Sequence, residues 1–158
     1  METVTIFVDV QNIYYTTKQR FQRRFDYNAF WAKATLNRKV NHAFAYAIDR
    51  GDEKQKQFQN ILRAIGFEVK LKPFIQRGDG SAKGDWDVGI AIDVMEYAKN
   101  SDVVIILSGD GDFDLLVQKI KKNFNNSVEI YGVHDLTSDA LIHSASKFIA
   151  IDDELLLK

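Results

Sequence analysis

The fold class is decided by the stretch Val103-Val104-Ile105-Ile106-Leu107-Ser108-Gly109-Asp110-Gly111-Asp112. Its first five residues are apolar and mostly β-branched, which is typical of a short strand buried on both faces of a parallel sheet. Two glycines and two aspartates follow at once, where the chain leaves the strand and must turn tightly. In open α/β sheets, ligands bind at the carboxyl ends of the strands, near a reversal of strand order. The stretch therefore predicts an α/β fold with a binding site at this edge of the sheet.

Short apolar segments alternate with helical patterns along the rest of the chain. Further strands are predicted at residues 4–8, 40–48, 67–73, 128–133 and 148–151. Helices are predicted after the N-caps Asp26 and Asp52, the second one ending at Gly66, and at 87–97, 113–124 and 136–145. This alternation favours a mainly parallel central sheet with helices on both faces, in three α/β/α layers. No linker or repeat divides residues 1–158, so a single domain is expected, with a turn-rich loop at 76–84 beside the site.

The composition excludes several classes of protein. The 158 residues include no cysteine, which excludes a disulfide scaffold, a thiolate zinc site and a cysteine nucleophile. The net charge of -1, from 21 basic and 22 acidic residues, argues against a protein that coats DNA. The chain shows neither a secretory leader nor an apolar run long enough to cross a bilayer. We therefore expect a cytoplasmic protein without a membrane partner.

Aspartates are predicted to gather where the strands end. They are Asp9, at the end of the first strand, Asp110 and Asp112, after the strand quoted above, and Asp85 and Asp87, at the start of the helix before it. If the two strands are parallel neighbours, these acids emerge at one edge of the sheet. Two carboxylates about 4 Å apart repel each other by roughly 4 kcal/mol at an effective dielectric constant near 20, so a cation would stabilise such a group. Oxygen ligands of this kind suit Mg²⁺ or Mn²⁺.

Helix capping is an alternative explanation for each of these acids. Aspartate is a favoured N-cap, so Asp85, Asp87, Asp110 and Asp112 could each begin a helix, and Asp9 could cap a turn. One cap after a strand would be enough, however, and the two glycines favour close approach of the backbone to a ligand. Asn12 could cap the next helix or hydrogen-bond Asp9.

Three motifs are similar to those of a known family. The segment Val8-Asp9-Val10-Gln11-Asn12 resembles its D-x-x-N motif at the end of the first strand. Residues 83–93, K-G-D-W-D-V-G-I-A-I-D, resemble its K-G-x-D-V-x-L-A-x-D motif, and residues 107–113, L-S-G-D-G-D-F, resemble its S-G-D-x-D-F motif. In this order and spacing, the motifs resemble those of NYN domains of the LabA-like group, which belong to the PIN-like nuclease superfamily.

The resemblance implies a fold, a metal site and an activity. It implies a PIN-like α/β/α fold and a metal-dependent nuclease, in particular a ribonuclease that cleaves phosphodiester bonds. Mg²⁺ or Mn²⁺ would be held by the catalytic residues Asp9, Asp87, Asp110 and Asp112, supported by Asn12, Asp93, Ser108 and Lys83. Two features depart from the family pattern. Asp85 adds an acid beside Asp87, and Ser146 stands where many relatives carry an aspartate before the last strand.

A basic and aromatic segment after the first strand is the predicted path for nucleic acid, with RNA favoured over DNA. Cations there can meet phosphates while aromatic rings stack on bases. The predicted contacts are Tyr14, Lys18, Arg20, Arg23, Arg24, Arg77 and Lys83, with Tyr15, Phe21 and Tyr27 in the same strip. The alternative is that the aromatic residues are core and the cations a solvated face.

Other functions compete with the nuclease interpretation. The main alternative is a non-catalytic module of the same fold that binds nucleic acid or a protein, and homo-oligomerisation is left open. A phosphatase of the haloacid-dehalogenase type needs a second acid two residues after Asp9, where this chain has Gln11. No G-x-G-x-x-G motif follows the first strand, which argues against a dinucleotide site.

Overall fold

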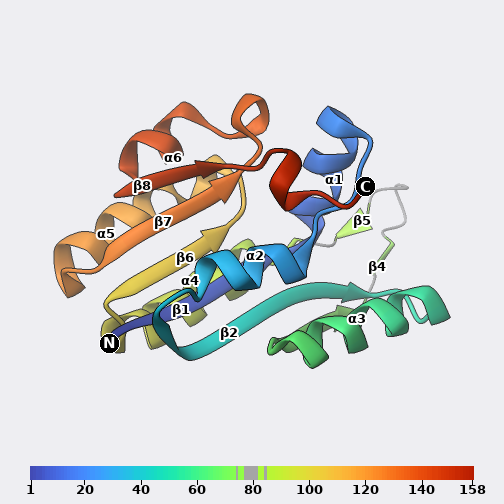
Figure 1. Cartoon of the computed structure of the whole chain (residues 1–158), viewed down its shortest axis with the longest axis horizontal. Coiled ribbons are helices and arrows are strands. Elements are labelled where there is room, and N and C mark those ends of the chain that lie inside the picture. The colour runs from blue at the N-terminus through green and yellow to red at the C-terminus, as the bar shows by residue number, and fades with distance from the viewer. Residues whose placement is uncertain (74, 77–81, 84) are drawn as a thin grey trace.

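A six-stranded parallel sheet forms the centre of the molecule (Figure 1). The computed structural model describes residues 1–73, 75–76, 82–83 and 85–158. In spatial order, the strands are β3 (Glu68–Pro73), β2 (Arg38–Asp49), β1 (Glu2–Asp9), β6 (Val103–Leu107), β7 (Ser127–Gly132) and β8 (Lys147–Ala150). Every neighbouring pair of these strands is parallel, which confirms the predicted α/β fold with its parallel sheet.

Helices cover both faces of the sheet and enclose two apolar cores. One face packs against α1 (Val10–Phe21), α2 (Tyr27–Ala34) and α3 (Glu53–Ile65). The other face packs against α4 (Asp87–Tyr97), α5 (Asp114–Phe124) and α6 (Asp139–Ser144). Short 3₁₀ segments lie at η1 (Ala98–Asn100), η2 (Gly111–Phe113), η3 (His134–Leu136) and η4 (Asp153–Leu155). The predicted three-layer arrangement is therefore confirmed, and no helix within the described ranges is long and apolar enough to cross a bilayer.

Local sequence signals account for the ends of α2 and α3. The Asp26 carboxylate accepts a hydrogen bond from Ala29 N at 3.0 Å, and the Asp52 carboxylate accepts one from Gln55 N at 2.8 Å. Both are the expected N-cap contacts, which satisfy amide groups that a helix leaves free. Gly66 ends α3 with a φ of 140°, a conformation that side chains rarely adopt, and the Trp31 ring occupies the space of a Cβ there.

The structure also differs from the predicted elements. Helix α1 was not predicted, because only three of its residues are buried and one of these is Thr17. The helix predicted at 136–145 begins only at Asp139, because the chain first forms η3, which ends at Leu136, and α6 starts after Ser138. In the loop predicted at 76–84, the short strands β4 (Ile75–Gln76) and β5 (Ala82–Lys83) pair antiparallel. The rest of that predicted loop lies outside the described residues.

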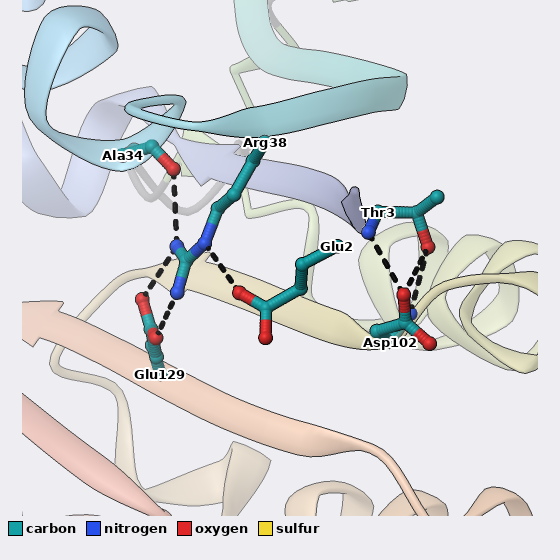
Figure 2. A network of polar contacts seen from close by, with 6 residues as sticks. All are labelled: Glu2, Thr3, Ala34, Arg38, Asp102 and Glu129. Carbon is teal, nitrogen blue, oxygen red and sulfur yellow. Dashed lines mark hydrogen bonds and ion pairs between the residues drawn. The ribbon is translucent and has the colours of Figure 1, made fainter.

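A buried ion pair ties the amino-terminal end of the sheet together (Figure 2). The Arg38 guanidinium donates to both carboxylate oxygens of Glu129 on β7, at 3.1 and 2.6 Å. It also donates to Glu2 on β1 and to the Ala34 carbonyl at the end of α2. Because the charged groups are mostly buried, each one needs its partner. Arg38 thus connects one helix and three strands at the end opposite to the predicted site.

Candidate metal centre

The predicted acids lie where the order of the sheet reverses. From β1 the chain builds β2 and β3 on one side, and later β6, β7 and β8 on the other. Val8 pairs with Leu107, so β1 and β6 end side by side and deliver Asp9 and Ser108 to the same edge. Ligands bind at this position in open α/β sheets. The predicted parallel pairing of these two strands is confirmed.

Three carboxylates converge at this edge. Asp87, Asp110 and Asp112 each offer one oxygen atom, and these atoms lie within 4.8 Å of one another. Asp110 accepts a hydrogen bond from Asp112 N at 2.9 Å and its own amide donates to Ser108 Oγ at 3.2 Å. Asp110 is thus also the cap of η2, as the alternative interpretation allowed, but capping does not account for the two other carboxylates.

The two glycines of this motif are required by the neighbouring loop. A Cβ at Gly109 would lie 2.9 Å from the Leu136 carbonyl, and one at Gly111 would lie 2.8 Å from the Ser138 side chain. The segment 109–111 therefore packs directly under the turn that leads into α6. The two glycines were predicted to bring the backbone close to a ligand. In the structure they bring it close to the turn before α6.

Asp9 adjoins the three carboxylates and is largely buried, with 8% of its surface exposed. It accepts hydrogen bonds from Asn12 N at 3.3 Å and from Ser108 Oγ at 3.2 Å. Burial raises the pKa of Asp9 to about 6, in spite of these hydrogen bonds, and the negative charges of Asp110 and Asp85 add to the rise. Asn12 Oδ1 accepts from Gly109 N at 2.9 Å, which joins the first motif to the third.

Asp87 has the other raised pKa of the site. Partial burial is the largest cause, and a hydrogen bond with Asp110 and the negative charges of Asp110, Asp9 and Asp85 add to it. Together they raise the pKa of Asp87 to about 7. Asp87 and Asp110 are thus close enough to share a proton when no cation is near. A divalent ion would replace that proton and remove the repulsion.

Asp85 and Asp93 have other contacts. Asp85 accepts a hydrogen bond from Asp87 N at 3.4 Å and lies outside the group of three, which favours Asp87 as the ligand. Asp93, one of the predicted supporting residues, accepts from Tyr46 Oη at 2.8 Å and from Lys70 Nζ at 2.6 Å. Its carboxylate is thus already neutralised by a lysine of β3.

Trp86 helps to position the site but was not predicted from the sequence. Its indole Nε1 donates to the Ala47 carbonyl of β2 at 2.9 Å, and Lys72 Nζ lies 4.6 Å from its ring centroid. A Cβ at Gly89 would approach the Trp86 ring to 2.5 Å. Trp86 therefore anchors the start of α4, and with it Asp87, on the sheet. The tryptophan between two aspartates and the glycine three residues later were the signal in the sequence.

The residues of the predicted nucleic-acid strip differ in the structure: some form ion pairs, some are buried and some are exposed. Arg20 forms an ion pair with Asp135 at 3.0 Å, and Arg23 forms one with Asp153 at 2.7 Å. Tyr27 is buried, as the structural alternative expected. Tyr14, Lys18 and Arg24 are exposed, and Lys18 Nζ lies 5.5 Å from the Tyr14 ring centroid. Arg77 and the side chain of Lys83 lie outside the described residues.

The donor set fits a hard divalent cation. Its donors are carboxylate oxygens. The Ser108 hydroxyl holds the neighbouring Asp9, and the Asn12 side chain holds the Gly109 backbone next to Asp110. Mg²⁺ and Mn²⁺ prefer such oxygen ligands and keep part of their water shell. The half-buried Asp110 and the exposed Asp112 leave access for this water.

Known proteins are similar to this chain in sequence and in fold. Residues 3–152 match the model of the NYN domain. The chain is 21% identical to the Low amplitude and bright protein LabA of Synechococcus elongatus, over 95% of this chain and 84% of LabA. It is 56% identical to the crystal structure of a protein of unknown function, VPA0982 from Vibrio parahaemolyticus, with a TM-score of 0.94 over 99% of this chain and 96% of that one.

A carbohydrate kinase from Agrobacterium tumefaciens shares only the arrangement of the fold. It is 13% identical, with a TM-score of 0.55 over 94% of this chain and 60% of the kinase. The match to the NYN model, in contrast, spans nearly all of the sequence and includes all three motifs. This protein therefore belongs to the NYN domain family.

Proposed function

We propose that this protein is a metal-dependent nuclease that cleaves phosphodiester bonds, with RNA as its substrate. The observation that carries the proposal is the convergence of Asp87, Asp110 and Asp112 within 4.8 Å, beside the buried Asp9. Four acids at one edge, two of them with raised pKa values, leave an excess of negative charge that a cation would stabilise. Membership of the NYN family supports the same conclusion.

Mg²⁺ or Mn²⁺ would be held by Asp87, Asp110 and Asp112, with Asp9 as the inner member. When bound, such an ion supplies charge stabilisation for a phosphodiester and lowers the pKa of water. The protein's own part is to fix the carboxylates. Ser108 and the amide of Asn12 orient Asp9, and the Asn12 side chain holds the Gly109 backbone that carries Asp110.

The substrate would approach along α1. This helix begins next to Asp9, and its exposed Tyr14 and Lys18 lie one to two turns further along. An aromatic ring beside an ammonium group suits a single strand, because the ring stacks on a base and the cation meets a phosphate. Arg24 would extend this path, whereas Arg20 and Arg23 are held by their acidic partners.

The test is cleavage of end-labelled single-stranded RNA and DNA by the purified protein with Mn²⁺, Mg²⁺ or EDTA. We expect metal-dependent cutting, with RNA preferred, that is lost in Asp110→Asn. The exposed Asp152, which lies outside the group of three, provides the control Asp152→Asn. Cutting that survives in Asp110→Asn would show that the acid cluster is not the site.

A second outcome would favour the alternative function. If the protein binds Mn²⁺ and single-stranded RNA but cuts neither nucleic acid, it is a binding module with a PIN-like fold. Binding that needs no metal and falls steeply with salt would support this alternative, because it would depend on Lys18 and Arg24 rather than on the acids.

A further inference from the structure

Two lysines of strand β3 lie on the face of the sheet that helix α4 covers, and only one of their charges is neutralised. Lys70 and Lys72 are two residues apart, so their side chains lie on the same face. Lys70 Nζ forms an ion pair with the Asp93 carboxylate at 2.6 Å. Lys72, at the carboxyl end of the strand, forms no ion pair with any residue that the structure describes. Its charge is therefore left uncompensated.

Two uncharged groups hold the Lys72 side chain in place. Its Nζ donates a hydrogen bond to the Asp85 carbonyl at 3.1 Å and lies 4.6 Å from the centroid of the Trp86 ring. That ring is itself fixed by the hydrogen bond from its indole to the Ala47 carbonyl. A lysine ammonium has three donors, and neither a carbonyl nor a ring removes its charge. The half-buried Lys72 thus presents an oriented positive charge with two donors that no described residue accepts.

This charge lies beside the acidic group of the site. Lys72 contacts the backbone of Asp85, which comes only two residues before the candidate ligand Asp87. A nucleic-acid strand carries a negative charge at every phosphate, but only one phosphate can lie at the metal ion. The next phosphate along the strand would be repelled by the exposed carboxylates of Asp85 and Asp112. A lysine at this place would attract that phosphate and offset the repulsion.

We propose that Lys72 binds the phosphate next to the one at the metal centre, so that the nucleic-acid strand crosses the carboxyl edge of the sheet. Tyr14 and Lys18 lie on α1, which covers one face, whereas Lys72 lies on the face that α4 covers. The acids lie at the edge between them. A flexible single strand can turn over this edge, but a duplex is too stiff to do so at low cost. This inference rests on the proposed function, since it needs a nucleic acid at the acids.

The test measures binding of a labelled single-stranded RNA of about 12 nucleotides by fluorescence anisotropy in Ca²⁺, over a range of salt concentrations. A gel of each sample checks that the RNA stays intact. Each phosphate contact contributes about 0.7 to the slope of log affinity against log salt for a single strand. Lys72→Gln should therefore lower this slope by about 0.7 and weaken binding about fivefold at low salt. Lys72→Arg keeps the charge and should restore most of both values.

Two controls separate a phosphate contact from other effects of the substitution. Lys39→Gln removes the same charge from an exposed lysine at the amino end of β2, and it should change neither the slope nor the affinity. Titration with Mn²⁺ tests whether Lys72 acts only by supporting Trp86 and the start of α4. In that case Lys72→Gln would lower the Mn²⁺ affinity. We expect no fall, because loss of a positive charge near the acids favours a bound cation. Circular dichroism checks that all variants are folded.

The outcomes distinguish this inference from the proposed function. If Lys18→Gln lowers the salt slope but Lys72→Gln leaves it unchanged, the strand stays on the face of α1, which overturns the inference and leaves the nuclease standing. A Lys72→Gln variant with lower Mn²⁺ affinity and an unchanged slope would also overturn it. If the slope depends on Lys72 but the wild-type protein cuts no RNA in Mn²⁺, the path is supported and the nuclease is not. A protein that binds no single strand would refute both.

Discussion

Asp9 is the most deeply buried of the four acids at the site, and its environment opposes its charge. Ser108 and the Asn12 amide offset part of the cost of burial, but the pKa still rises to about 6. Asp112, in contrast, is exposed to solvent. The four aspartates are thus not equivalent. One is held inside by the fold, two are half-buried and one is exposed.

Replacing Asp9 by asparagine should stabilise the metal-free protein at neutral pH. The folded-state pKa of about 6 lies above the ordinary 3.8, so ionised Asp9 destabilises the fold increasingly as the pH rises from about 4 through 6. Asp9→Asn should remove a penalty on the order of 3 kcal/mol and raise the melting temperature in EDTA near pH 7.5, with little effect near pH 4. A calorimetric scan of both proteins at the two pH values measures this. Equal gains at both would mean that the Asp9 charge is not the cause.

Metal affinity should fall as the pH is lowered through the two raised pKa values. Below about 7 Asp87 holds a proton in the metal-free protein, and below about 6 Asp9 does so as well. Each proton that must leave on binding lowers the apparent affinity by up to about tenfold per pH unit. Calorimetric titration of Mn²⁺ between about pH 5 and pH 8 tests this. An affinity that stays constant over this range would mean that neither group gives up a proton.

Among the elements, strand β6 and helix α4 were predicted with the bounds that the structure has, because their patterns are unbroken and their flanks carry turn residues. Helix α1 escaped prediction because its surface is mostly polar. The acids of the site were found from strand ends and motifs. The contacts of Asp93 were not, since Asp93 lies on helix α4 and its partner Lys70 on strand β3, and the sequence alone does not show which residues of the two elements meet. For the same reason the partners of Arg20 and Arg23, more than a hundred residues away, could not be foreseen.

The start of helix α4 should depend on Trp86. Trp86→Phe removes the hydrogen bond to the Ala47 carbonyl, which is worth about 1 kcal/mol, so Asp87 is held less firmly. We expect Mn²⁺ affinity to fall about fivefold, with a modest loss of stability. Trp31→Phe is the control, because Trp31 packs on Gly66 and Phe67. Since these are the only two tryptophans, Trp31→Phe also leaves Trp86 as the sole tryptophan for a fluorescence titration. A fall in stability without a change in affinity would make Trp86 merely structural.

At the scale of the whole molecule, the two ends of the sheet differ in what they carry, the candidate site at one end and a stabilising ion-pair network at the other. The carboxyl ends of the strands carry the acids, and the amino ends are tied by Arg38, Glu129 and Glu2 (Figure 2). The fold class followed from the alternation of strands and helices. The Arg38–Glu129 ion pair could not be predicted, because it joins residues 91 positions apart that no local pattern connects.

Breaking this tie should affect stability and leave the site intact. Glu129→Gln leaves the largely buried Arg38 guanidinium with only the half-exposed Glu2 carboxylate as its partner, which should cost about 2 kcal/mol in the free energy of unfolding. Glu154→Gln, which breaks the exposed pair with Lys33, should cost less than about 1 kcal/mol. Urea unfolding gives both values, and Mn²⁺ titration should show the same affinity in both variants. Lost metal affinity in Glu129→Gln would mean that the two ends are coupled.

The reversal of strand order at β1 also has a consequence for folding during synthesis. Asp9 leaves the ribosome early, but Ser108, its hydrogen-bond partner, is 99 residues further on. Strand β1 therefore has a neighbour on both sides only after β6 has been synthesised. The four acids cannot come together before then. Contacts so distant along the chain form late and slowly. A chain interrupted during synthesis before residue 103 would lack the acids of the third motif, so an unfinished molecule should be inert towards the cell's nucleic acids.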